Sequence, residues 1–116
     1  MKIEVLRESL HKAIATVLPA VASKSTLPVL SHILLSATDD GRLTLSATNL
    51  EVSIQTSVSA RVETPGATTL PAKLLSDLIG GLPNVLIALE LNEHNQETRI
   101  EAGAFKTTIK GIEADE

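Results

Sequence analysis

Apolar residues recur every three or four positions near the start of the chain, and this spacing predicts one apolar stripe along a helix. The stripe consists of Leu6, Leu10, Ile14, Val17 and Val21. Pro19 lacks an amide donor and clashes with the preceding turn, so we expect the helix to end or bend near Leu18. No residue before Arg7 is a good N-cap, which leaves the start of the helix open by a few residues.

After a polar loop over residues 22–28 the apolar period changes to two, which predicts strands. The first two candidates, Leu30–Ala37 and Leu43–Ala47, flank the turn signal Asp39-Asp40-Gly41. The longest alternation covers Val52–Val62, with apolar side chains on one face and mostly serine on the other. Pro65-Gly66 predicts the turn that ends this long strand.

A second cycle of the same kind follows. Ala67–Leu70 is a short strand candidate, and Pro71 is expected to open a helix that ends at Gly80-Gly81. The apolar face of this helix is predicted to contain Leu74, Leu75, Leu78 and Ile79. Three further strand candidates complete the cycle: Val85–Leu91, Thr98–Ala102 and Phe105–Lys110.

The element order is therefore strand, helix, three strands, and then the same order again, which indicates an internal duplication of architecture. Two helices cannot cover both faces of eight strands, so we expect them side by side on one face of antiparallel sheets. The fold class is α+β with two pseudo-repeated β-α-β-β-β units. A length of 116 residues predicts a single domain, 1–116.

Composition removes several classes of function. The chain has no cysteine, which excludes disulfide frameworks, thiolate zinc sites and cysteine nucleophiles, and this composition fits a reducing cytoplasm. No apolar run approaches the roughly 20 residues of a membrane-spanning helix, and Glu4 is foreign to a signal peptide. A single aromatic residue argues against single-strand nucleic-acid binding, in which bases stack on aromatic rings.

No set of residues in the sequence predicts catalysis or metal binding. The histidines, His11, His32 and His94, fall in a helix, a strand and a loop, and no pair has the spacing of a zinc site. Neither a nucleophile elbow nor a phosphate-binding glycine loop occurs. We therefore predict a non-catalytic protein without a metal or cofactor.

The charges are unevenly distributed. The predicted helices and the loop after the first carry Arg7, Lys12, Lys24 and Lys73 against Glu8 and Asp77, or +2, while the whole chain is at −4. The remaining segments therefore carry −6. On composition alone this distribution also fits an ordinary solvated helix face.

Four segments in order along the chain resemble the first domain of the bacterial DNA polymerase III β subunit, the replicative sliding clamp. They are Ser25-Thr26-Leu27-Pro28-Val29-Leu30, Ala47-Thr48-Asn49-Leu50-Glu51, Pro65-Gly66-Ala67-Thr68-Thr69-Leu70-Pro71-Ala72-Lys73 and the end of the chain from Ile109 to Glu116. The resemblance implies a DNA-clamp domain, the first of three similar domains in a ring of head-to-tail subunits. A chain of this length would then be a truncated piece of the whole subunit.

The resemblance also implies a function. Helices of the family line a central hole through which double-stranded DNA passes without base-specific contacts, while the sheets form the outer wall. The ring is a non-catalytic processivity subunit of DNA-directed DNA polymerase, whose holoenzyme is the nucleotidyltransferase of DNA replication, and it acts in the cytoplasm. Polymerase and clamp loader bind domains that lie outside this sequence.

Site residues carry over position by position. Lys24, Lys12, Lys73 and Arg7 match basic family positions near DNA, although Arg7 could instead lie over the core at the edge of the apolar stripe. The joint between subunits uses an outer edge strand, which here implies a subunit interface at Phe105, Lys106, Thr107 and Leu74. Phe105 fits core packing equally well. Gly103-Ala104 stands where many relatives carry basic residues, so ion pairing at the joint differs in this chain.

Two other interpretations stay open on the residues alone. A β-rich module could bind a protein partner through its C-terminal edge strand and have no role on DNA. A small-molecule or hydrolytic domain would instead need a concave pocket with convergent polar groups between helix and sheet.

Overall fold

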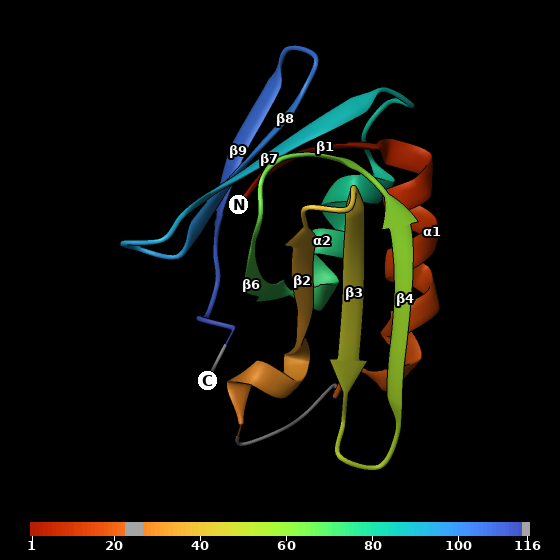
Figure 1. Ribbon diagram of the computed structural model, residues 1–116. Coiled ribbons are helices and arrows are strands. Elements are labelled where there is room, and N and C mark those ends of the chain that lie inside the picture. The colour runs from red at the N-terminus through yellow and green to blue at the C-terminus, as the bar shows by residue number, and fades with distance from the viewer. Residues whose placement is uncertain (23–26, 115–116) are drawn as a thin grey trace.

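Two antiparallel sheets and two helices make up the computed structural model, which describes residues 1–22 and 27–114 (Figure 1). In the five-stranded sheet the order is β5 (Arg61–Thr64), β1 (Lys2–Leu6), β7 (Leu86–Asn92), β8 (Glu97–Ala102) and β9 (Phe105–Lys110). In the four-stranded sheet it is β4 (Ser53–Ser59), β3 (Arg42–Thr48), β2 (His32–Thr38) and β6 (Gly66–Pro71). The helices are α1 (Arg7–Val17) and α2 (Ala72–Gly80), with short 3-10 turns η1 (Leu18–Ala20) and η2 (Pro28–Ser31).

The predicted duplication is confirmed, and the two units exchange their first strands. One unit is β1-α1-β2-β3-β4 and the other is β6-α2-β7-β8-β9. Strand β1 pairs with β7 of the second unit, whereas β6 pairs with β2 of the first. Each sheet therefore contains strands of both units, and neither unit can complete its sheet alone.

One hydrophobic core lies between the sheets and the helices. Side chains from both sheets and both helices are fully buried in it, among them Ile3, Leu10, Ile14, Leu35, Leu45, Leu75, Ile79 and Ile87. The predicted stripe of α1 is confirmed for Leu10, Ile14 and Val17. For Leu6 it is wrong, because Leu6 ends β1 and is 55% exposed. In place of a side-chain cap, the Arg7 amide donates to the Val85 carbonyl at 3.0 Å.

The long strand predicted over residues 52–62 is wrong as a single element. It breaks at Ala60 into β4 and β5, which belong to different sheets. The Ala60 amide donates to the Gly41 carbonyl at 2.9 Å at the point where the chain crosses over. Burial alternates without interruption from Ile54 to Val62, so the period of two carries no sign of the break.

Three boundary predictions also need correction. Pro71 does not open α2 but ends β6, where it pairs with His32. Leu30 lies in η2, and β2 begins two residues later than expected because Pro28 starts a 3-10 turn. Leu74 does not join the apolar face of α2: it is 53% exposed, while Leu75 and Ile79 are buried.

The C-terminal segment is fastened along the free side of β6. Thr69 and Ile112 exchange two backbone hydrogen bonds of 3.1 Å, and the Thr69 hydroxyl donates to the Ile112 carbonyl at 2.8 Å. Gly111 allows this approach, since a Cβ there would lie 2.2 Å from the Thr69 carbonyl oxygen. The segment thus ends beside the four-stranded sheet, although it leaves the five-stranded one.

We predict that Gly111→Ala weakens this attachment, because a backbone oxygen cannot move aside as a flexible side chain can. The free energy of unfolding in urea should fall by about 1–3 kcal/mol, as for other overpacked sites. Gly81→Ala is the matched control: its Cβ would meet nothing nearer than 3.7 Å, and its backbone is helical. Equal stability of the two variants would contradict the close packing at Gly111.

His32 gives a second test of the same region. The Thr69 hydroxyl donates its proton to Ile112, so the 3.1 Å contact between His32 Nδ1 and Thr69 Oγ1 requires a proton on Nδ1. Burial lowers the pKa of His32 below its ordinary 6.5, and the hydrogen bond to Thr69 offsets only part of this effect. The folded chain therefore binds fewer protons on His32 than the unfolded chain does just below this pH.

The sign of the resulting pH dependence follows. The stability contributed by neutral His32 is complete above 6.5 and is lost as the pH falls toward the lower folded pKa. We predict that His32→Gln, which keeps a donor for Thr69, reduces the loss of unfolding free energy between about pH 7.5 and about pH 5.5. The other histidines and the carboxylates are common to both proteins, so an unchanged difference would contradict the lowered pKa of His32.

Candidate nucleic-acid interface

Both helices lie on the same side of the molecule and pack against each other. Figure 1 shows α1 and α2 behind the strands of the four-stranded sheet. A Cβ on Gly80 of α2 would lie 3.5 Å from the His11 ring of α1, so the helices approach closely at this point. His11 thus fills the contact between helices, and the predicted pairing of the helices on one face is confirmed.

Lys12 lies on the face of α1 that points away from the core. Its side chain is 76% exposed and its ammonium is 3.9 Å from Glu8, one helical turn earlier. Such an exposed pair contributes little, about 0.3–0.5 kcal/mol at most. The ammonium can therefore exchange Glu8 for a phosphate at little cost.

Lys73 occupies an exposed position in the first turn of α2, with exposed Asp77 one turn further along. Lys12 and Lys73 are thus both solvent-facing residues of the helix layer. Lys24, which the sequence also placed near DNA, lies outside the described residues.

Arg7 has a role that its spacing did not reveal. Its Nε donates to the Ile79 carbonyl at 3.1 Å and its Nη2 donates to the Gly80 carbonyl at 2.8 Å. These carbonyls end α2, where the helix dipole favours a positive charge. Arg7 thus ties the beginning of α1 to the end of α2, and its guanidinium is already engaged within the protein.

We predict that Arg7→Gln lowers the free energy of unfolding by about 1–3 kcal/mol, because it removes two charge-assisted hydrogen bonds that span 72 and 73 residues. Arg7→Lys should recover only part of this, since an ammonium cannot reproduce the planar fork. Lys12→Gln is the control and should change stability by less than about 0.5 kcal/mol. If Arg7→Gln were as mild as Lys12→Gln in urea unfolding, the link between the helices would have no energetic weight.

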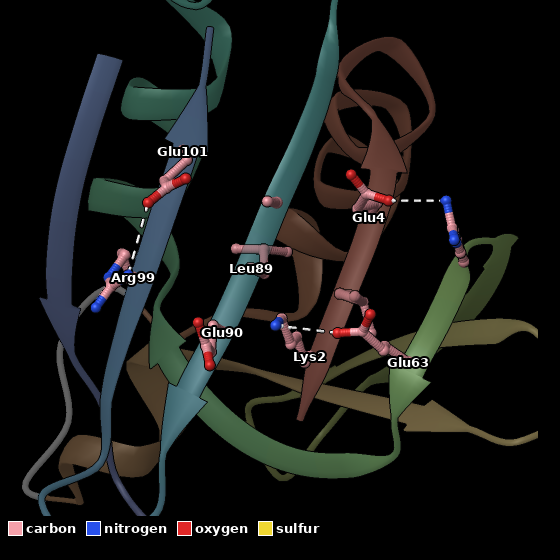
Figure 2. Close-up of a pocket in the computed structure, with 10 residues that line it drawn as sticks. Lys2, Glu4, Glu63, Leu89, Glu90, Arg99 and Glu101 are labelled. Atoms are coloured by element: carbon pink, nitrogen blue, oxygen red, sulfur yellow. Dashed lines mark ion pairs between the residues drawn. The ribbon is translucent and has the colours of Figure 1, made fainter. Parts of the chain in front are cut away.

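The outward face of the five-stranded sheet has a different charge pattern. Its strands alternate buried apolar with exposed charged side chains, which line a shallow open depression (Figure 2). The charged residues are Lys2, Arg61 and Arg99 against Glu4, Glu63, Glu90 and Glu101. Lys2 pairs with Glu63 at 3.1 Å, Arg61 with Glu4 at 3.6 Å, and Arg99 with Glu101 at 3.7 Å. Glu63 raises the pKa of Lys2 by a hydrogen bond and by its charge.

Pairing on this face leaves one excess negative charge. Every cation there has a carboxylate within 4 Å, and Glu90 is the fourth carboxylate. On the helices, the described charges are three cations and two carboxylates: Arg7, Lys12 and Lys73 against Glu8 and Asp77. The two layers therefore differ in the sign of their net charge.

The residues predicted for a subunit interface lie at or near an edge. β9 is the outer strand of the five-stranded sheet, as expected. Phe105 begins it and is 39% exposed, so the chain's only aromatic side chain is not buried in the core. Lys106 is exposed and Thr107 half-buried on the same strand, while Leu74 presents an exposed apolar side chain on α2.

Candidate sites of other kinds are few. In residues 1–22 and 27–114 no group of three or more His, Asp or Glu side chains is arranged to hold a metal ion. No helix in this part of the chain is long and apolar enough to cross a membrane.

Paired helices on one side of two exchanged β-α-β-β-β units define the class as a DNA-clamp domain. The chain belongs to the family "DNA polymerase III beta subunit, N-terminal domain", whose model matches residues 1–116.

Relatives and solved structures agree on this family. The chain is 40% identical over 118 residues to the beta sliding clamp of Synechococcus elongatus, covering 100% of this chain and 31% of the relative. It is 34% identical to the beta sliding clamp of Caulobacter vibrioides, covering 98% and 31%. The crystal structure of the DNA polymerase sliding clamp from Caulobacter crescentus superposes with a TM-score of 0.94 at 32% identity, over 100% of this chain and 31% of that one. The chain therefore spans about a third of the length of these relatives.

Proposed function

We propose that this chain acts as the first of three domains of a sliding clamp, which encircles duplex DNA and tethers the replicative polymerase. In this proposal α1 and α2 line the hole and the sheets form the outer wall. The whole protein is non-catalytic and works in the cytoplasm. Polymerase and clamp loader bind domains outside this sequence, and β9, with Phe105, Lys106, Thr107 and nearby Leu74, joins one subunit to the next.

The observation that carries the proposal is the separation of charge between the two layers. Lys12 and Lys73 are exposed on the helix layer, and the opposite sheet face has its cations paired and one carboxylate in excess. Phosphates attract the first surface and repel the second. A ring built from such domains would therefore keep DNA against its helices.

The same side chains suit sliding rather than fixed binding. Lysine is a flexible point charge, and contacts to phosphates carry no base sequence information. Base-edge hydrogen bonds would instead hold the ring at one sequence. We assign the phosphate contacts to Lys12, Lys73 and Lys24, and we place Arg7 behind them, where it fixes the helix that carries Lys73.

We predict that Lys12→Glu together with Lys73→Glu, in the full-length protein, weakens retention on circular duplex DNA. The dependence of log affinity on log salt should become shallower by about one unit for each phosphate that the protein no longer neutralises. DNA retention measured across a salt series tests this, and Lys24→Glu should weaken retention further.

The matched control is Lys2→Glu with Arg99→Glu, which changes the net charge equally on the outward sheet face. If the proposal holds, this variant keeps the slope of the unmodified protein and loses only the weak uniform attraction of net charge. An equal reduction of retention in both variants would show that the helix layer has no special relation to DNA.

A further inference from the structure

Two sheet edges of this chain are equivalent by the internal duplication. β4 is the last strand of the first unit and the outer strand of its sheet, and β9 holds the same position in the second unit. Proline, which would block the addition of a further strand, interrupts neither of them. Residues 52–60 also carry no charge at all.

Half of the backbone groups of each edge strand point away from its neighbour. In the β3–β4 ladder the Asn49 amide bonds Val52 and the Ala60 amide bonds Gly41, which fixes the alternation. The amides of Gln55 and Ser57 accordingly point outward. By the same alternation the Gly111 bond to Gln96 leaves the amides of Lys106 and Thr108 pointing outward on β9.

One antiparallel register matches the two edges over the full length of β9. It places Ser53 opposite Lys110, Gln55 opposite Thr108 and Ser57 opposite Lys106. These outward pairs would each exchange two hydrogen bonds. The intervening residues then face the core side on both strands, which keeps each sheet's burial pattern continuous across the joint.

Side chains in this register are complementary. On the core side Ile54 meets Ile109, Thr56 meets Thr107, and Val58 meets the exposed ring of Phe105. Pairs of β-branched residues, of threonines, and of an aromatic with a β-branched residue are favourable across strands. Phe105 thereby gains an apolar partner that it lacks as an edge residue.

Charge favours this pairing over a symmetric one between two β9 strands. On the solvent side the lysines of β9 would face Ser57 and Ser53, which are neutral. Two antiparallel β9 strands would instead place Lys106 opposite Lys110, and like charges directly opposite each other are destabilising.

We infer that β4 and β9 are two halves of one joint, through which this chain associates head to tail with a second copy of itself. The inference rests on the proposed function only for the use of β9 as an interface; the role of β4 is additional. A joint between different surfaces continues until it closes into a ring or remains an open filament.

The test is sedimentation velocity of the 116-residue chain across a concentration series, without DNA. Ser57→Pro blocks β4 and Thr108→Pro blocks β9, each by removing an outward amide that bonds no neighbouring strand. We expect the unmodified chain to form species larger than dimers and each variant alone to be monomeric. An equimolar mixture of the two variants should give a one-to-one dimer and nothing larger.

Other outcomes would overturn the inference. Dimers of Thr108→Pro alone would indicate symmetric β4 pairing, dimers of Ser57→Pro alone would indicate symmetric β9 pairing, and a monomeric unmodified chain would exclude the joint. Because no DNA is present, each of these results leaves the salt-dependence test of the helix lysines unaffected.

Charge variants test the register even if a proline variant fails to fold. Ser57→Lys places a lysine opposite Lys106 and should weaken association about tenfold. Adding Lys106→Glu to the same chain makes every joint an opposite-charge pair and should restore association. Failure of this rescue, with circular dichroism showing both variants folded, would contradict the proposed register.

Discussion

The exchange of first strands between the two β-α-β-β-β units is the constraint on which the rest of the structure depends. β1 completes the sheet of the second unit and β6 completes the sheet of the first. Each helix follows its exchanged strand directly, so both helices must start beneath the sheet of the other unit. This connection brings α1 and α2 together on one side, and the bonds from Arg7 to the end of α2 fix their relative position.

A two-sided molecule follows from this arrangement. Because the helices bury their apolar stripes against both sheets, their outer faces and the outward sheet face are the two large surfaces left to solvent. The first carries Lys12 and Lys73, whereas on the second the cations are occupied by Glu4, Glu63 and Glu101. A duplex that meets such a domain is guided to the helices by phosphate charge alone. Attraction of this kind is independent of sequence, which a sliding protein requires.

Much of the fold could be predicted from sequence because the periods are strong. The stripe of Leu10, Ile14 and Val17 and the alternation in β9 predicted the correct elements, since burial on one face imposes those spacings. The break at Ala60 left no trace, because apolar alternation continues on both sides while the chain changes sheets. Leu6 and Leu74 were misplaced for a related reason: leucine fits the spacing of a buried face even where no neighbour covers it.

The candidate site was less accessible to sequence reasoning. Exposed lysines on helices follow from the apolar stripes that leave them outside, so Lys12 and Lys73 could be located in advance. The bonds of Arg7 join residues more than 70 positions apart, and no local pattern encodes them. The ion pairs of the outward sheet depend on strand order, which the sequence did not specify. The resemblance to clamp domains located the β9 edge, while its match to β4 required the observed register.

The most direct measurement for the central claim is photo-crosslinking to duplex DNA in the full-length clamp. The crosslinking side chain is placed either at Ala15, which is exposed on α1, or at Arg99 on the outward sheet. The account predicts crosslinks from position 15 to duplexes of any base sequence and essentially none from position 99. Equal crosslinking from both positions, or crosslinking from position 15 with only one sequence, would contradict it.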